Sequence, residues 1–150
     1  MARRFQFSLQ TLLRVRQLAE REAGRKVGAK RAEIARLDSL NADAQDAISQ
    51  QHRALETLQR GDRLDPGQLS RPRAWIAHLR RAIAERQSIR AGWLQELGVL
   101  QAALIESRKQ TKTIEKLRER RLDAHGRAIR RREQHDAEEL AQQLHGHVDP

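Results

Sequence analysis

The chain has 150 residues, a formal net charge of +10, 33% charged residues, 3% aromatic residues and no cysteine. So few large apolar side chains argue against an ordinary globular core, and the lack of cysteine excludes disulfides and thiolate metal sites. No apolar run approaches the ~20 residues that span a bilayer, so we expect no transmembrane segment. A disordered chain has a similar composition, and only the spacing of the apolar residues argues against disorder.

A first long helix is predicted from about residue 8 to residue 60. Ser8 is of a type preferred at the N-cap. The basic stretch from residue 1 to residue 14 lacks the apolar core of a secretory signal, although an Arg-rich transit peptide remains an alternative for it. From Leu9 onward, small or apolar residues recur at spacings of three and four, which is typical of a coiled-coil seam. These seam residues include Leu9, Leu13, Ala23, Val27, Ile34, Leu37, Ala44, Ile48, Leu55 and Leu58.

A loop is predicted at about residues 61–71. Asp65, Pro66 and Gly67 form a turn signal, and Ser70 before Pro72 indicates a helix start near residue 71. The second helix is predicted to end at about residue 144, and residues 145–150 form a frayed tail. Its seam residues include Ile76, Leu79, Ile83, Trp93, Leu97, Leu100 and Leu104.

The two seams predict an all-α fold in which two long helices form an antiparallel coiled-coil hairpin, with the second helix longer. We expect a single domain over residues 1–150. Facing residues in such a hairpin have a constant sum of residue numbers, and a sum near 134 pairs Leu58 with Ile76 and places Asn41 opposite Trp93. Seven-residue slips are competing registers. A polar Asn in the seam typically fixes the register at some cost in stability.

Positive charge is concentrated in two stretches. Residues 1–31 carry nine Lys/Arg and two Asp/Glu, residues 108–133 carry eleven and four, residues 32–107 carry ten of each, and residues 134–150 carry four acids and no Lys/Arg. An antiparallel fold brings the two basic stretches together, which favours an acidic partner, although a solvated helix face is the alternative. Polar residues also replace apolar ones in the seam at this end of the hairpin. We therefore predict that the packing of the two helices is incomplete there until a partner completes it. The degraded positions are Ser107, Thr111, Arg118 and Arg121.

Catalytic chemistry is absent from the sequence. There is no glycine-rich phosphate loop, and no serine has a base positioned beside it in the helical pattern. His145 and His147 are the nearest approach to a metal-chelating pair, and they lie in the predicted tail. We therefore expect no enzyme activity, no cofactor and no metal site. The shortage of aromatic residues for base stacking also argues against nucleic acid as the partner.

Three stretches carry a family resemblance. The sequence from Phe5 through Phe7, Leu9 and Leu13 to Arg16 resembles the F-x-F-x-L-x-x-L-L-x-x-R opening of the FliJ-type flagellar export proteins. Residues 114–121 and 133–141 are similar to the C-terminal L-E-K-L-x-E-R and E-x-x-x-x-D-E-x-A patterns of that family. Each motif alone is weak, and their order and spacing make the resemblance more specific.

The resemblance implies a two-helix protein similar to the central stalk of rotary ATPases. Such proteins belong to the bacterial flagellar type III export apparatus and lie in the cytoplasm at the inner face of the cell membrane. The implied partners are the ring of the export ATPase, the cytoplasmic domain of the export gate and export chaperones. A stalk of a virulence-type secretion system is the near alternative. A basic coiled coil that binds nucleic acid or anionic membrane is the alternative from another class.

The resemblance also implies site residues. For the gate they are Trp75, Leu79 and Ala82; core packing is an equal explanation for Leu79, and the lack of tyrosine on the first helix departs from the family. For the ATPase ring, the motifs and the charge map together indicate Phe5, Phe7, Leu9, Leu13, Arg16, Arg118, Arg121, Arg130, Arg131 and Arg132.

Overall fold

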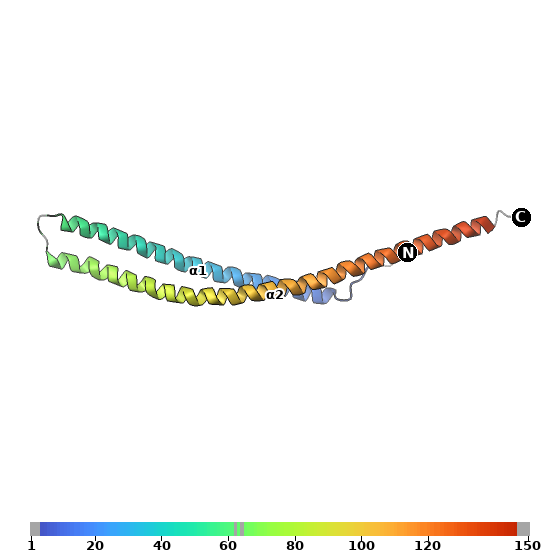
Figure 1. Ribbon diagram of the computed structural model, residues 1–150, viewed down its shortest axis with the longest axis horizontal. Helices are drawn as coiled ribbons and strands as arrows, with labels where there is room; N and C mark the ends of the chain where they lie inside the picture. The colour runs from blue at the N-terminus through green and yellow to red at the C-terminus, as the bar shows by residue number, and fades with distance from the viewer. Residues whose placement is uncertain (1–3, 62, 64, 147–150) are drawn as a thin grey trace. The chain divides into compact units, whose positions relative to one another are not determined.

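The computed structural model describes residues 4–61, 63 and 65–146. These residues form two helices, α1 (Gln10–Gln59) and α2 (Pro66–Gly146), and no strand occurs among them (Figure 1). The predicted all-α class, the antiparallel pairing and the longer second helix are confirmed. The last four residues of the predicted tail, 147–150, lie outside the described residues. Within the described part of the chain, neither helix has a stretch apolar and long enough to cross a membrane.

The start of α2 differs from the sequence prediction. The helix begins at Pro66 rather than near residue 71, because Asp65 acts as its N-cap. The Asp65 carboxylate accepts a hydrogen bond from the Gly67 amide at 3.1 Å, and the Asp65 carbonyl accepts one from the Gln68 amide at 3.0 Å. Pro66 then occupies the first helical position, where a missing N–H costs nothing. Ser70, the expected start signal, lies inside the helix and donates to the Gly67 carbonyl.

The chain divides into two compact units, each made from parts of both helices. Unit 2 comprises residues 22–104 and is a helical hairpin; unit 1 comprises residues 1–21 and 105–150. The single domain expected for residues 1–150 stays a prediction. The core of unit 2 is formed by residues from both helices, with Leu69 and Leu79 packed against it: Ala44, Ile48, Leu55, Ile76 and Ile83.

The register of unit 2 is one heptad away from the predicted one. Asp38 pairs with Arg90 at 2.7 Å and Lys30 with Glu96 at 2.8 Å, so facing residue numbers add to about 127 instead of 134. A heptad seam is satisfied equally well by a seven-residue slip, and the early start of α2 selects the shorter loop.

The new register changes the surroundings of Asn41. It lies beside Gln87 and Arg90 at a hollow of about 430 Å³ rather than opposite Trp93. Its Oδ1 atom is buried and has no hydrogen-bond partner. The Trp93 ring instead lies 5.3 Å from Lys30 Nζ. Hydrogen bonds from Lys30 to Glu96 and Glu33 raise the pKa of that lysine. Asn41 is therefore a polar defect near the middle of the seam in the described part of unit 2.

Candidate functional site

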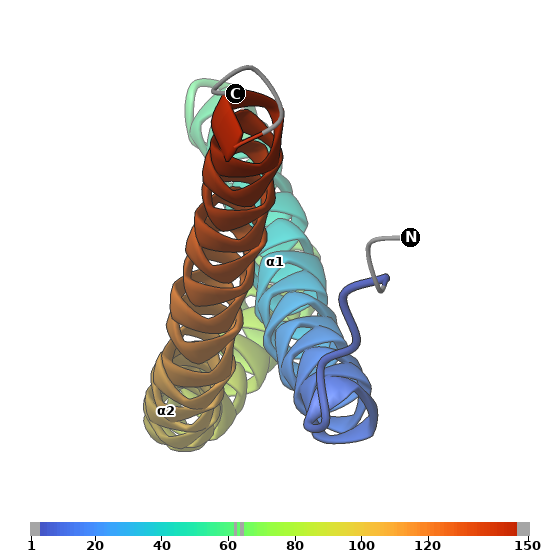
Figure 2. The ribbon, with the colours of Figure 1, turned by 90° about the vertical axis from the view of Figure 1, so that its right-hand side faces the viewer.

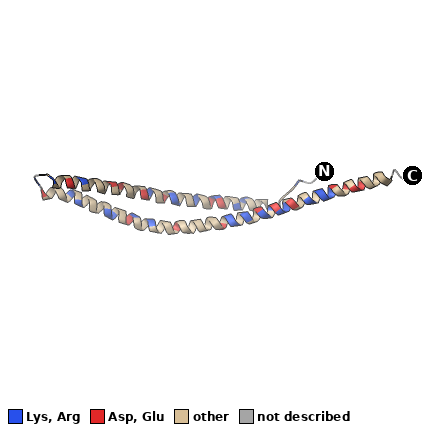
Figure 3. Ribbon diagram, turned by 45° about the horizontal axis from the view of Figure 1, so that its top comes forward, with Lys and Arg blue, Asp and Glu red and all other residues tan. Residues whose placement is uncertain are grey.

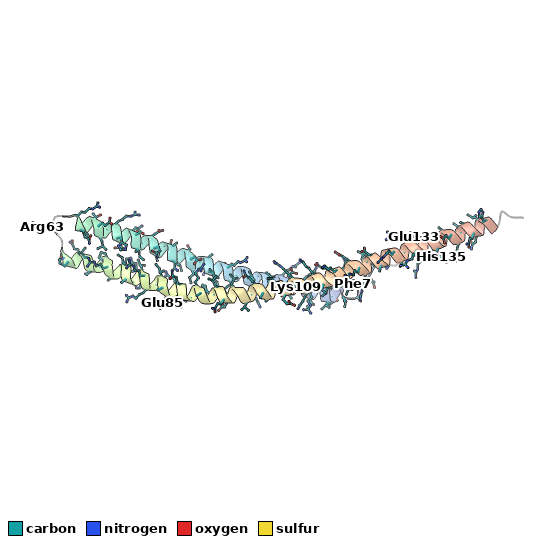
Figure 4. All side chains as sticks on the ribbon, viewed as in Figure 1. Phe7, Arg63, Glu85, Lys109, Glu133 and His135 are labelled. Carbon is teal, nitrogen blue, oxygen red and sulfur yellow. The ribbon has the colours of Figure 1, made fainter. Side chains whose placement is uncertain are left out.

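The core of unit 1 joins the segment that precedes α1 to the first turns of α1 and to α2. Phe7 and Leu13 are buried against Ile114, and Phe5, Leu9 and Leu117 pack around them. Figure 2 shows the non-helical segment 4–9, in dark blue, at the start of α1, and Figure 4 labels Phe7 beside α2. The structure thus brings together the four predicted apolar site residues, Phe5, Phe7, Leu9 and Leu13. Phe7 and Leu13 are buried, whereas Phe5 and Leu9 are half-buried. The expectation that a partner completes this end stays a prediction.

Two arginines that looked like seam defects hold this segment in place. The Arg118 guanidinium lies 5.9 Å from the Phe5 ring, and that of Arg121 lies 5.6 Å from the Phe7 ring. A guanidinium over an aromatic face is attracted by the ring quadrupole. Arg121 also donates to the Ser8 hydroxyl at 2.8 Å. The cationic side chains at these seam positions therefore serve the packing of unit 1.

Thr111, another polar seam position of unit 1, also has hydrogen-bond partners. Thr111 is buried, and its hydroxyl lies 3.0 Å from the Ser107 carbonyl and 3.3 Å from the Arg16 carbonyl. The Arg16 guanidinium donates to the Gln110 side-chain oxygen at 2.6 Å. Arg16, another predicted site residue, is therefore half-buried and engaged within the unit. The seam therefore stays closed at Thr111 although this residue is polar.

An exposed apolar stripe on α1 was missed by the sequence reasoning. Leu12, Val15 and Leu18 are 38%, 54% and 61% exposed. Their spacing of three, on a face outside the seam, was the available signal. On α2 of the same unit, exposed lysine and arginine side chains recur at spacings of three and four. This basic ridge consists of Lys109, Lys112, Lys116 and Arg120.

The predicted residues Arg130, Arg131 and Arg132 lie apart from the Phe7 cluster. They are exposed on the last part of α2, which has no second helix beside it in Figure 1. Figure 3 shows that a basic stretch is followed by an acidic stretch along this part of the helix. His135, Asp136 and Glu139 have ligand atoms within 4.8 Å of one another, but all three are exposed, and such clusters are common on charged helices. They carry no metal assignment.

The gate candidates lie in unit 2 and differ in exposure. Trp75 is 47% exposed, and its ring stacks on His78 with centroids 5.3 Å apart. Ala82 is half-buried and lines a hollow of about 520 Å³ together with His78 and Arg81. Leu79 packs against the core of unit 2, which is the alternative stated for it from the sequence. Trp75 is therefore the most exposed member of this set, and Ala82 is half-buried without being packed in the core of unit 2.

A comparison with protein families identified one matching model. The family is described as "FliJ: Flagellar FliJ protein", and the match covers residues 5–148. It therefore includes segments of both units and all three motif stretches. The searches of curated proteins and of solved structures each gave no match.

Proposed function

Because the chain belongs to the FliJ family and is thus a protein of the flagellar export apparatus, we propose that it is a non-enzymatic stalk that engages the ring of the export ATPase. The family match over nearly the whole chain is the observation that carries this proposal. The match also favours the flagellar apparatus over a virulence-type secretion system.

We assign the ATPase contact to the exposed surface of unit 1. Phe5, Phe7, Leu9 and Leu13 are packed against α2, so their role is to hold the two helices of unit 1 together. The stripe of Leu12, Val15 and Leu18 is free to be buried by a partner, because these side chains are 38–61% exposed. Burial of such side chains gives each roughly 1.5–3 kcal/mol when complete.

Charge supplies the other part of this contact. The basic ridge on α2 and the exposed Arg130, Arg131 and Arg132 give unit 1 an excess of positive charge. A concentrated charge of one sign steers association with a surface of opposite sign and raises the association rate. We therefore expect the ring surface that receives unit 1 to be acidic.

We propose a second contact, through unit 2, with the cytoplasmic domain of the export gate. Trp75 and Ala82 carry it, because the exposed Trp75 ring stacks on His78, which lines the same hollow as Ala82. Export chaperones are a further partner class that the family suggests, and no residue is assigned to them. With these proposed partners, the protein would work in the cytoplasm at the inner face of the membrane, and this location is part of the proposal.

The test adds the purified chain to its export ATPase and measures ATP hydrolysis and ring formation. The wild type should stimulate both. A charge-reversed variant (Arg130→Glu, Arg131→Glu, Arg132→Glu) and an apolar-stripe variant (Val15→Asp, Leu18→Asp) should lose most of the stimulation with unchanged helicity. Val99→Asp is the matched control, since Val99 is 71% exposed in unit 2 and should be neutral.

The other function classes give different outcomes in the same assay. Tight binding of DNA or anionic vesicles without any effect on the ATPase would replace the proposal with a nucleic-acid or membrane role. Stimulation of a virulence-type secretion ATPase in preference to the flagellar one would favour the other stalk. Loss of helicity in the charge-reversed variant would mean that these arginines serve the fold.

A further inference from the structure

The last part of α2, residues 133–146, is an acidic helix in which every residue is exposed. We name it the acidic segment. It contains Glu133, Asp136, Glu138 and Glu139 and no lysine or arginine. Figure 4 labels Glu133 and His135 on it, and Figure 3 shows this acidic stretch after the basic one. The segment therefore offers a concentrated negative charge to a basic surface.

One face of the acidic segment is apolar. Its apolar residues follow the spacing i, i+3, i+4, i+7, which places them on one side of a helix: Ala137, Leu140, Ala141 and Leu144. Leu140 and Leu144 are 60% and 61% exposed. A helix with this spacing of apolar residues is the form in which one protein fills an apolar groove of another. The acidic segment is thus suited to such a groove.

A groove with basic side chains lies between the two helices of unit 2, near the loop that joins them. It includes a hollow of about 440 Å³. Leu55 and Ile76 are buried and form the floor of this hollow, whereas Arg73 and Arg80 are exposed on its α2 side. Glu56, on the α1 side, is the acidic residue among those that line it. The groove therefore combines an apolar floor with an excess of positive charge.

The groove continues along the same side of unit 2. Arg80, Gln87 and Leu94 recur at intervals of seven on α2, and positions seven apart lie on the same side of a coiled coil. Gln87 and Leu94 line the hollow at Asn41, and Leu94 is 42% exposed. At ~1.5 Å per residue, the groove from Arg73 to Leu94 is about 30 Å long and the acidic segment is about 20 Å long. The groove can therefore receive the whole segment.

Charge matches the acidic segment to this groove. Arg73 and Arg80 are about 10 Å apart along α2, and Glu133, Asp136 and Glu139 recur at intervals of three over about 9 Å. Neither arginine forms an ion pair with another residue in the described part of the chain. Surfaces of opposite charge attract each other and fix the register of a complex. The same chain thus supplies both halves of a complementary contact.

We propose that the acidic segment of one copy of this chain docks in the groove of unit 2 of a second copy. Leu140 and Leu144 cover the hollow above Leu55 and Ile76, and the acidic side chains face the arginines on its α2 side. Each copy carries both a segment and a groove, so association either closes into a pair or continues as an open chain. One short helix buries less than the standard interface, so the contact is weak and depends on concentration.

This contact is separate from the proposed function. The gate candidates Trp75 and Ala82 line neither hollow of the groove. The inference needs no component of the export apparatus, and the purified chain alone is enough to test it.

The first experiment measures mass by sedimentation equilibrium of the full chain at low salt. The wild type should move from 17.3 kDa to higher mass as its concentration rises. A groove variant (Arg73→Glu, Arg80→Glu) and a segment variant (Asp136→Arg, Glu139→Arg) should each stay monomeric, and an equimolar mixture should recover the association. The control variant (Arg36→Glu, Arg53→Glu) makes the same change in net charge as the groove variant, at exposed α1 positions outside the groove, and should associate like the wild type.

Recovery on mixing separates docking from a structural role, because one damaged fold would not be rescued by another. In the mixture, the reversed groove meets the reversed segment, and the unchanged groove meets the unchanged segment. A wild type that stays monomeric at every concentration overturns the proposal, as does a mixture that does not associate. Association that neither variant weakens overturns it too.

Two further variants in the same measurement separate docking in the groove from attraction between net charges. Ala77→Trp fills the hollow without changing the charge and should weaken association, whereas Ala54→Trp, at an exposed α1 position outside the groove, should not. The variant with Leu140→Ser and Leu144→Ser keeps all four acids and should also associate poorly. Wild-type association in both Ala77→Trp and the serine variant would show that charge alone is responsible, and the assignment to the groove would be wrong.

The second experiment locates the contact by disulfide formation in the otherwise cysteine-free chain. Full chains with Ala77→Cys and with Leu140→Cys should each stay reduced alone under mild oxidation, because a groove does not meet a groove and a segment does not meet a segment. An equimolar mixture of the two should form a disulfide-linked pair on a non-reducing gel. Ala54→Cys mixed with Leu140→Cys is the control and should stay reduced. Cross-linking of Leu140→Cys alone, with none in the mixture beyond it, would show that segments pair with each other and overturn the proposal.

Discussion

Asn41 is a polar residue in the seam of unit 2, and its side-chain carbonyl makes no stabilising hydrogen bond there. Its Oδ1 atom is buried without a partner beside Gln87 and Arg90. Leaving a buried acceptor unpaired costs roughly 1–3 kcal/mol. We therefore predict that Asn41→Leu raises the free energy of unfolding by about 1–2 kcal/mol, measured by urea denaturation followed by circular dichroism.

Asn41→Ala is the control for this substitution. It removes the carbonyl without filling the hollow, so its gain should be smaller than that of leucine. If both variants unfold at lower urea concentrations than the wild type, the Asn41 side chain stabilises the fold, and the prediction is wrong. The Asp38–Arg90 ion pair holds the same turn of the hairpin in either variant.

Trp75 and Leu79 lie one turn apart on α2 but have different surroundings. Trp75 is 47% exposed, whereas Leu79 packs on the core of unit 2. We predict that Trp75→Ala changes the unfolding free energy by less than about 1 kcal/mol but weakens binding to the gate domain at least about tenfold, equivalent to ~1.4 kcal/mol.

Leu79→Ala should behave in the opposite way to Trp75→Ala. It should destabilise unit 2 by about 2 kcal/mol or more, as large-to-small changes in packed positions do. Calorimetric titration of each variant with the gate domain, alongside urea unfolding, separates the two effects. Unchanged affinity in Trp75→Ala would remove the exposed ring from the proposed gate contact.

At the scale of the helices, Asp65 decides where α2 begins. Its carboxylate accepts from the Gly67 amide, which is otherwise unpaired in the first turn. Replacement of an N-cap aspartate by alanine costs about 1 kcal/mol. We predict that Asp65→Ala lowers stability by this amount and accelerates hydrogen exchange in the first turn of α2. Exchange in residues 105–121 of unit 1 should stay unchanged; acceleration there would show that the cap affects more than its own turn.

The helices could be predicted from sequence because their seam residues recur regularly, as from Ile34 and Leu37 to Ile76 and Ile83. The register could not, because a heptad seam looks the same after a seven-residue slip. The information that separates the registers lies in pairs far apart in the chain, such as Asp38 with Arg90 and Lys30 with Glu96. Single residues in the sequence do not reveal which partner each will meet.

The closure of unit 1 was hidden from sequence for a different reason. Phe5 and Phe7 precede the helix and follow no helical period, so their packing partners cannot be derived from spacing. Arg118 and Arg121 looked like breaks in the seam, whereas they lie over the two aromatic rings. Phe5, Phe7, Leu9 and Leu13 therefore lie together within unit 1, Arg130, Arg131 and Arg132 lie apart from them, and the exposed stripe of α1 was overlooked.

At the scale of the whole molecule, the proposed ATPase contact combines exposed apolar side chains on α1 with exposed arginines on α2 of the same unit. Leu12, Val15 and Leu18 are exposed, as are Arg130 and Arg132. Salt screens the attraction between exposed charges. We therefore predict that stimulation of the export ATPase by the wild type falls as the salt concentration rises.

Two variants separate the charged part of this contact from the apolar part. The variant with Arg130→Glu and Arg132→Glu should stimulate poorly at low salt, and added salt should change its stimulation little. The variant with Val15→Asp and Leu18→Asp keeps the arginines, so its remaining stimulation should still fall as the salt concentration rises. The measurement is ATP hydrolysis against salt concentration, with circular dichroism on the same samples. Wild-type stimulation that does not depend on salt would remove the arginines from the proposed contact.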